Sequence, residues 1–210
     1  MAIALARLYP IVDEGLLSRN VLDVASFAEG LREAGVRLVQ YRNKVDGPQK
    51  VLQAADVIRG VFANVECRLI LNDRADLAVL AGWDGVHVGQ GDLSPEDSRR
   101  VVGPKRWVGV STHTEEQVRL ADSSCTDYVA VGPVFVTGTK LDAEPVIGLA
   151  GVKVARSLTK KPIVAIGGIT RENARSVIDA GADSVAVISA LIVNGEPVAK
   201  VARDFLDVLR

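Results

Sequence analysis

The sequence predicts an α/β fold, a (β/α)8 TIM barrel in which residues 1–210 form one domain. Short apolar runs rich in β-branched residues alternate with longer segments of helical periodicity from one end of the chain to the other. Four units look alike, each with a small or polar segment before an apolar strand: GVRLVQYR, GWDGVHVG, CTDYVAVG and GADSVAVIS. A dinucleotide-binding sheet would need a GxGxxG turn after the first strand, and this turn is missing. Recurrent units joined by parallel crossovers therefore favour the closed barrel.

Each strand is predicted from an apolar run and each helix from the periodic segment that follows it. Ser94 before Pro95 marks one helix start, and Thr114 with Gln117 has the spacing of a side-chain cap at another. Pro10 fits poorly inside the first strand, because it cannot donate a ladder hydrogen bond. The predicted strands lie near 7–12, 37–41, 68–72, 84–88, 106–110, 127–132, 162–166 and 183–188. The predicted helices lie near 23–34, 48–63, 74–81, 95–102, 115–122, 149–158, 172–180 and 197–209.

Composition excludes several classes of function. The 210 residues are 48% hydrophobic, enough for one buried core, and no change in composition marks a second domain. Because 25 Lys and Arg residues balance 26 Asp and Glu residues, nothing favours a nucleic acid partner. Cys67 and Cys125 lack the spacing of a zinc site or a disulfide framework. No run reaches the length of a membrane span and no signal peptide is recognisable, so a cytoplasmic protein is expected, and a homo-oligomer is left open.

Two carboxylates follow buried strands. Asp73 comes directly after the run RLILN, and Asp92 follows GVHVGQG. The carboxyl ends of all strands in a parallel barrel open on one face, so both side chains are expected at the same mouth. An oxygen-only pair favours Mg²⁺ over zinc, and Mg²⁺ usually accompanies phosphate esters. The alternative is structural, since Asn72 or Asp73 could cap the helix beginning near 74 and Asp92 could belong to a Gly-Asp turn.

Cations follow the second strand, which closes with Gln40, Tyr41, Arg42, Asn43 and Lys44. Arg42 and Lys44 are two residues apart, so they point the same way from an extended chain and could together hold a diphosphate. The alternative is that Arg42 and Lys44 are exposed charges at the strand end, as isolated basic residues more often are.

Other polar residues near the strand ends give a weaker signal. Ser111 ends the fifth strand and faces the same mouth. His87 lies within a strand, where a hydrogen-bonded core histidine is the better interpretation, and His113 could be either core or catalytic. No Ser/His/Asp nucleophile signature is present, and no lysine is placed for Schiff-base chemistry.

The last two strands end in turns suited to a phosphate. Gly167-Gly168 and Ile188-Ser189 bring backbone N–H groups to the mouth, where this fold often binds a phosphate monoester. The loop 132–148 is long and carries Thr137, Gly138, Thr139 and Lys140, which supply hydroxyls and a positive charge. The glycines could instead serve only as tight turns, and the loop could be a solvated insertion.

Several segments together match one known family. They are QYRNK at 40–44, LNDRADLAVLAGWDGVHVGQGDL at 71–93, GVSTHT at 109–114, GPVFVTGTK at 132–140, and IGGIT with GADSVAVISA near the C-terminus. On these motifs the chain resembles the thiamine phosphate synthase family over nearly its whole length. The resemblance implies a Mg²⁺-dependent transferase of thiamine biosynthesis. Such an enzyme joins hydroxymethylpyrimidine diphosphate to a thiazole monophosphate and releases pyrophosphate.

The resemblance also implies a role for each matching residue. Asp73 and Asp92 would bind Mg²⁺. The pyrimidine diphosphate would be held by Gln40, Tyr41, Arg42, Asn43, Lys44, Asn72, Ser111 and Lys140. The catalytic members of that set would be Arg42, Lys44, Ser111 and Lys140. The thiazole phosphate would be held by Thr137, Gly138, Thr139, Gly168, Ile188 and Ser189.

Three positions depart from the family pattern, and three other functions stay open. Asn43 and Gly91 stand where acids are usual, and Val136 stands where proline is common. A thiazole tautomerase on the same barrel would rely on acid–base groups such as His113. Asp73 and Asp92 argue against it, because tautomerisation leaves no diphosphate to neutralise. A sugar-phosphate isomerase would need a paired base that the sequence does not reveal. The non-catalytic alternative is a barrel that binds thiamine precursors.

Overall fold

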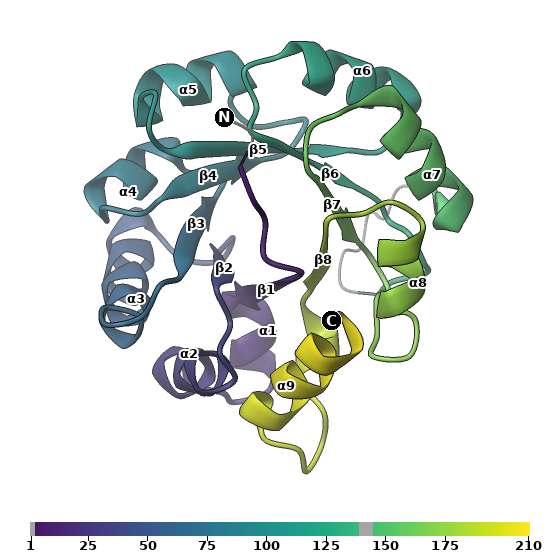
Figure 1. The fold of residues 1–210 in the computed structure, drawn as a ribbon. Helices are drawn as coiled ribbons and strands as arrows, with labels where there is room; N and C mark the ends of the chain where they lie inside the picture. The colour runs from purple at the N-terminus through teal and green to yellow at the C-terminus, as the bar shows by residue number, and fades with distance from the viewer. Residues whose placement is uncertain (1–2, 139–144) are drawn as a thin grey trace.

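The computed structural model describes residues 3–138 and 145–210, and these form a closed barrel of eight parallel strands (Figure 1). The strands follow one another in chain order, and β8 pairs with β1 to close the sheet. The predicted barrel is therefore confirmed, and Pro10 does lie inside the first strand, in register with Val187. The strands are β1 (Leu8–Asp13), β2 (Leu38–Arg42), β3 (Arg68–Asn72), β4 (Gly85–Val88), β5 (Trp107–Thr112), β6 (Tyr128–Val131), β7 (Ile163–Ile166) and β8 (Ser184–Val187).

The predicted helices are present around the outside of the barrel (Figure 1). They are α2 (Val24–Glu33), α3 (Pro48–Val61), α4 (Ala75–Leu80), α5 (Pro95–Val102), α6 (Glu115–Ser123), α7 (Gly148–Leu158), α8 (Ala174–Asp179) and α9 (Val198–Val208). Two short elements were not predicted, α1 (Glu14–Arg19) and the 3-10 turn η1 (Ser189–Leu191), because neither is long enough to reveal a period. Among the described residues, no helix has the length and apolar character needed to cross a membrane.

The predicted helix caps at Ser94 and Thr114 are confirmed. The Ser94 hydroxyl accepts a hydrogen bond from the backbone N–H of Asp97 at 3.0 Å. The Thr114 hydroxyl accepts one from the N–H of Gln117 at 3.2 Å. Each cap satisfies a first-turn donor that has no partner within its own helix, so these residues fix where α5 and α6 begin.

Apolar side chains form two layers, because alternate residues of a strand face opposite sides of the sheet. One layer lies between the barrel and the helices and includes Trp83 and Phe205. The chain before β1 crosses the amino end of the barrel (Figure 1), where Ile3, Leu5 and Ala6 pack against the interior layer. The interior layer is formed by Tyr9, Ile11, Leu38, Ile70, Tyr128, Ala130, Val164 and Ala186.

Three of the recurrent sequence units share a structural role. Asp84, Asp127 and Asp183 precede β4, β6 and β8, and each carboxylate accepts a hydrogen bond from a backbone N–H of the preceding strand. The donors are Leu69, Val108 and Ile163, at 2.9, 2.7 and 2.8 Å. The same carboxylates pair with Arg68, Arg99 and Arg156 at 2.8, 2.5 and 3.0 Å. Each aspartate therefore ties two neighbouring strands together near their amino ends.

Replacement of Asp127 with Ala should destabilise the barrel. The substitution leaves the Val108 N–H without its acceptor and the Arg99 guanidinium without its carboxylate partner, which should lower the free energy of unfolding by about 1–3 kcal/mol. Asp56→Ala is the matched control, since Asp56 makes only an exposed pair with Arg59 and should change stability by about 0.5 kcal/mol or less. Urea unfolding measures both, and equal losses in the two variants would contradict a strand-tying role for Asp127.

Candidate active site at the barrel mouth

A cavity opens at the carboxyl ends of the strands, and several predicted site residues line it. Gln40 and Arg42 of β2, Asn72 of β3, Ser111 of β5 and Ile188 after β8 all reach this cavity, although they are far apart in the sequence. The sequence-based prediction that strand ends meet at one mouth is confirmed for these five residues. The full lining is Tyr9, Ile11, Gln40, Arg42, Asn72, His87, Ser111, Thr112, His113, Ala130, Val164, Ile166, Ala186 and Ile188.

Arg42 is held in place by a residue that the sequence analysis missed. The Arg42 guanidinium forms a short ion pair with Asp13, which is 5% exposed and lies beside Arg42 in the β1–β2 register. The other oxygen of Asp13 accepts the N–H of Leu16 at 2.8 Å and so caps α1. A signal was available, because Asp13 ends an apolar strand in the same way as Asp73.

Lys44, Asp73 and Asp92 gather at another part of the rim. Lys44 Nζ lies 2.8 Å from Asp73 Oδ2. Burial raises the pKa of Asp73 above its ordinary value; Lys44 opposes this shift, whereas the adjacent Asp92 carboxylate adds to it. Asp92 is fixed in turn by the backbone N–H of Gly89, which donates to its Oδ2 at 2.8 Å. The two acids predicted to share a cation therefore do lie next to each other.

Asp73 adopts a backbone conformation that is uncommon outside glycine. Its φ is 63°, and its N–H donates to the backbone oxygen of His87 at 2.7 Å. This contact ties the residue to β4 and turns its carboxylate toward the residues that follow that strand. Asp73 does not cap α4, because the N-cap position belongs to Arg74 and has no side-chain hydrogen bond. The structural alternative considered for Asp73 is therefore wrong.

The donor set at these two acids suits a hard divalent cation. Two carboxylates offer oxygen ligands, which Mg²⁺ prefers, while further oxygens would come from water and a bound phosphate ester. No cluster of three or more His, Cys, Asp or Glu side chains that could hold a metal is found in residues 3–138 and 145–210. Such a centre would therefore be incomplete without the ligand, as is usual for Mg²⁺ sites that bind substrate phosphates.

The glycine turns after β7 make close contact with the loop that follows β6. Gly167 and Gly168 have φ values of 104° and 62°, which glycine adopts without strain. A Cβ on Gly168 would lie 2.5 Å from the backbone oxygen of Val136, so only glycine fits there. Asn173 fastens this turn by donating to the Gly168 oxygen at 3.0 Å and accepting the Thr170 N–H at 2.8 Å.

The structure describes some of the other residues that were predicted at the strand ends near these turns. Ile188 precedes the 3-10 turn that Ser189 begins, so both lie at the carboxyl end of β8. Thr137 and Gly138 stand at the end of the described part of the loop. Thr139 and Lys140 lie outside the described residues.

Three residues of the second-strand motif are not part of the cavity lining: Tyr41, Asn43 and Lys44, of which Lys44 lies at the rim beside Asp73. The Tyr41 ring is fully buried between the barrel and the helices against Trp83, and its hydroxyl donates to Glu14 at 2.8 Å. Asn43 organises the β2–α3 loop instead, since its side-chain oxygen accepts the N–H groups of Val45 and Asp46, both at 3.0 Å. Tyr41 and Asn43 therefore both make structural contacts, and their contact with substrate, which the resemblance implies, stays a prediction.

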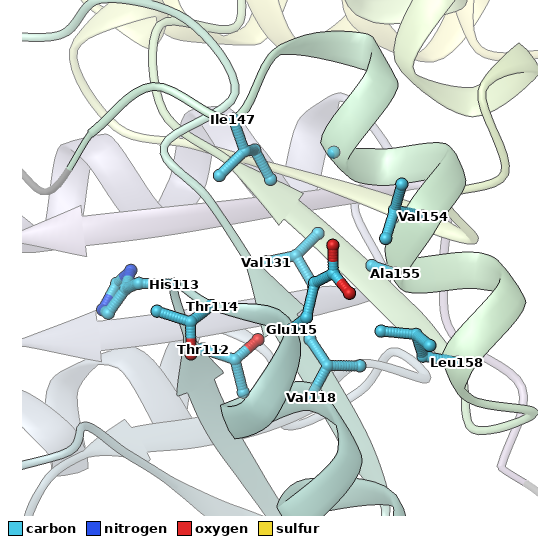
Figure 2. Close-up of a pocket in the computed structure, with 11 residues that line it drawn as sticks. Thr112, His113, Thr114, Glu115, Val118, Val131, Ile147, Val154, Ala155 and Leu158 are labelled. Atoms are coloured by element: carbon cyan, nitrogen blue, oxygen red, sulfur yellow. The ribbon is translucent and has the colours of Figure 1, made fainter.

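A second cavity, of about 260 Å³, lies outside the barrel between α6 and α7 (Figure 2). Its walls are mostly apolar, and Glu115 projects into it from the start of α6. Thr112 and His113 line both this groove and the mouth, and His113 Nδ1 lies 2.6 Å from the backbone oxygen of Gly132. His113 is therefore fixed at the boundary between the two cavities.

The fold and the mouth together define a (β/α)8 barrel with charged and polar side chains gathered at the carboxyl ends of its strands. Residues 8–191 match the family model of thiamine monophosphate synthase, and the chain belongs to that family.

Named relatives agree with this assignment along the whole chain. The thiamine-phosphate synthase of Koribacter versatilis (strain Ellin345) is 50% identical over 98% of this chain and 96% of its own length. That of Methanosarcina mazei is 37% identical over 96% of this chain and 82% of its own length. Among solved structures, a thiamine phosphate pyrophosphorylase from Pyrococcus furiosus superposes with a TM-score of 0.85 at 32% identity, covering 97% of this chain and 95% of that one.

Asn43 and Lys44 should respond to substitution in opposite ways. Asn43→Ala removes the acceptor for two loop N–H groups, so it should lower the free energy of unfolding by about 1–2 kcal/mol and leave pyrophosphate affinity unchanged. Lys44→Ala should weaken pyrophosphate binding about tenfold with little change in stability, because its ammonium is half exposed. Urea unfolding and calorimetric titration with pyrophosphate measure the two effects. Equal losses of pyrophosphate affinity in the two variants would show that Asn43 also belongs to the binding site.

Proposed function

We propose that this protein is a thiamine-phosphate synthase that couples 4-amino-2-methyl-5-hydroxymethylpyrimidine diphosphate to 4-methyl-5-(2-phosphoethyl)thiazole. The products are thiamine monophosphate and pyrophosphate. The observation that carries the proposal is the mouth itself, where the cations and acids at the ends of β2, β3 and β4 lie across from the glycine turn after β7 and the 3-10 turn after β8. Two phosphorylated substrates need two such anion sites at one cavity.

The diphosphate is assigned to the side of the mouth that carries Arg42 and Lys44. A guanidinium held by Asp13 presents donors in a fixed fork, which suits phosphate oxygens. Asp73 and Asp92 would hold Mg²⁺ beside Lys44, and the ion would neutralise charge on the diphosphate when bound. Lys140 would add a further positive charge, as the family resemblance implies.

The pyrimidine ring is assigned to the cavity below the diphosphate. Ile11, Ala130 and Val164 give this cavity an apolar floor. Gln40, Asn72 and Ser111 stand on its walls and offer hydrogen bonds to a polar heterocycle. A flat ring with polar edges fits such a lining.

The proposed chemistry requires no protein nucleophile. The bond between the pyrimidine methylene carbon and the diphosphate oxygen breaks, and its electron pair leaves with pyrophosphate. The electron-rich pyrimidine stabilises the resulting cation, and the lone pair of the thiazole nitrogen then forms the new carbon–nitrogen bond. That nitrogen loses no proton, so the protein's tasks are to stabilise the leaving group and to hold both reactants in contact.

The thiazole phosphate is assigned to the turns after β7 and β8. Gly168, Ile188 and Ser189 would present backbone N–H groups, and Thr137, Gly138 and Thr139 would close over the same anion. The close contact between Gly168 and Val136 supports this, since it joins the turn to the loop that carries those threonines.

The decisive assay incubates the pure protein with both phosphorylated substrates, with and without Mg²⁺. Thiamine monophosphate is detected by the fluorescence of its oxidised form, and pyrophosphate is measured in parallel. Equal amounts of both products are expected, formed only when Mg²⁺ is present. Conversion of a thiazole phosphate isomer without pyrophosphate release would indicate a tautomerase, and binding of both substrates without any product would indicate a sensor.

Asp92→Asn should reveal the metal site. The substitution keeps an acceptor for the Gly89 N–H but removes a charged ligand, so half-maximal turnover should require at least about tenfold more Mg²⁺. Asp179→Asn is the control, because Asp179 forms an exposed pair with Arg175 on α8. Turnover measured across a Mg²⁺ titration separates the variants. An unchanged Mg²⁺ requirement in Asp92→Asn would exclude Asp92 as a ligand.

A further inference from the structure

A chain of polar side chains crosses the barrel interior between two residues of the mouth. Gln40 Nε2 donates to the Tyr9 hydroxyl at 3.1 Å, and that hydroxyl lies 3.0 Å from the Tyr128 hydroxyl. The Tyr128 hydroxyl lies 3.1 Å from His87 Nδ1, and His87 Nε2 lies 2.9 Å from Ser111 Oγ. The chain therefore joins β2, β1, β6, β4 and β5. None of its three interior members was predicted to have a role in function.

The sequence leaves space for this chain at a cost in apolar packing. Gly109 is in register with Tyr128 on the neighbouring strand, and a Cβ there would lie 2.0 Å from the Tyr128 ring. The Tyr128 ring stacks on His87 with centroids 5.6 Å apart and meets the Tyr9 ring edge-on at 6.2 Å. Both tyrosines are at most 1% exposed. Burying a polar group is costly unless it is hydrogen-bonded, and each polar group of this chain has a partner within it.

The direction of the hydrogen bonds follows from the Gln40 end. An amide nitrogen can only donate, so Tyr9 accepts there, which leaves its single proton available for the Tyr128 hydroxyl that it also contacts. Burial raises the pKa of both tyrosines well above the ordinary value, so each keeps its proton. Tyr128 then donates to His87 Nδ1, which leaves the ring proton on Nε2, facing Ser111.

We propose that His87 is a positioning residue that donates from Nε2 to Ser111 Oγ and thereby leaves the Ser111 proton for substrate. A hydroxyl has one proton and two lone pairs, so a serine that accepts from His87 presents its own O–H to the cavity. Gln90 holds the same residue from the other side, since its Nε2 donates to the Ser111 backbone oxygen at 2.6 Å. The acceptor is an oxygen or ring nitrogen of the pyrimidine diphosphate, an identity that rests on the proposed function.

The position of the ring proton can be read without any activity measurement. The chain has two histidines, so ¹⁵N-imidazole spectra contain two sets of signals, and the set missing from His87→Gln belongs to His87. The expected spectrum has a protonated Nε2 and an unprotonated Nδ1. Tyr128→Phe should shift part of the proton to Nδ1, because the group that donates to Nδ1 is lost. A wild-type His87 protonated at Nδ1 would overturn the proposal.

Kinetics test what the histidine does for Ser111. His87→Leu removes the donor, whereas His87→Gln keeps an N–H near the position of Nε2. We expect His87→Leu to lower kcat about tenfold or more with KM changed less than about threefold, and His87→Gln to restore most of the rate. Ser111→Ala should add little to His87→Leu, because the two residues act as one unit. Equal losses in His87→Leu and His87→Gln, or additive losses with Ser111→Ala, would overturn the positioning role.

Two controls keep the outcomes separable. Ser98→Ala removes another fully buried hydroxyl, one without a hydrogen-bond partner among the described residues, and it should leave kcat unchanged. Urea unfolding checks that each variant is folded, and Tyr128→Phe takes the place of His87→Leu in the rate measurements if the latter does not fold. If the wild-type protein forms no thiamine monophosphate, the proposed function fails, while the ¹⁵N spectra still decide the hydrogen-bond direction.

Discussion

Closure of the parallel sheet is the constraint on which the whole site depends. Because the strands run in the same direction and β8 pairs with β1, residues as far apart as Asp13 and Ile188 meet at one rim. The aspartates that tie neighbouring strands together lie at the opposite end, where Asp127 and its two counterparts accept backbone N–H groups. The strand-tying aspartates and the candidate ligand-binding residues therefore lie at different ends of the same strands.

Arg42 and Lys44, the two cations of the mouth within the described residues, already have negative partners. Arg42 pairs with the buried Asp13, and Lys44 pairs with Asp73. These carboxylates hold the side chains in place, so part of the entropy cost of binding is met during folding. The two pairs differ, because Asp13 also accepts the Leu16 N–H and is therefore fixed beside Arg42. Asp73 lies beside Asp92, so its charge is shared between interactions with Lys44 and with a second carboxylate.

The fold was predictable because barrel strands are continuous apolar runs, and the rim was predictable because polar residues directly follow those runs. Alternation along β2 would also have separated Tyr41 from Gln40 and Arg42, because neighbouring residues in a strand face opposite sides. What the sequence could not reveal is the chain through Tyr9, Tyr128 and His87. Those contacts depend on the register and tilt of strands across the barrel, and neither is encoded in any local pattern. Asp13 was missed although it ends an apolar strand, because the six-residue helix that it caps is too short to show a period and so gives no second signal.

The double role of Asp13 links the local folding of α1 to the geometry of the rim. One oxygen of its carboxylate receives the Leu16 N–H, and the other receives Arg42. If α1 frays, the carboxylate gains rotational freedom, and the guanidinium that it anchors becomes disordered with it. The first helical turn after β1 therefore helps to hold in position an arginine that belongs to a different strand. Local unfolding of α1 on heating would therefore weaken the proposed anion binding at a lower temperature than the one at which the barrel unfolds.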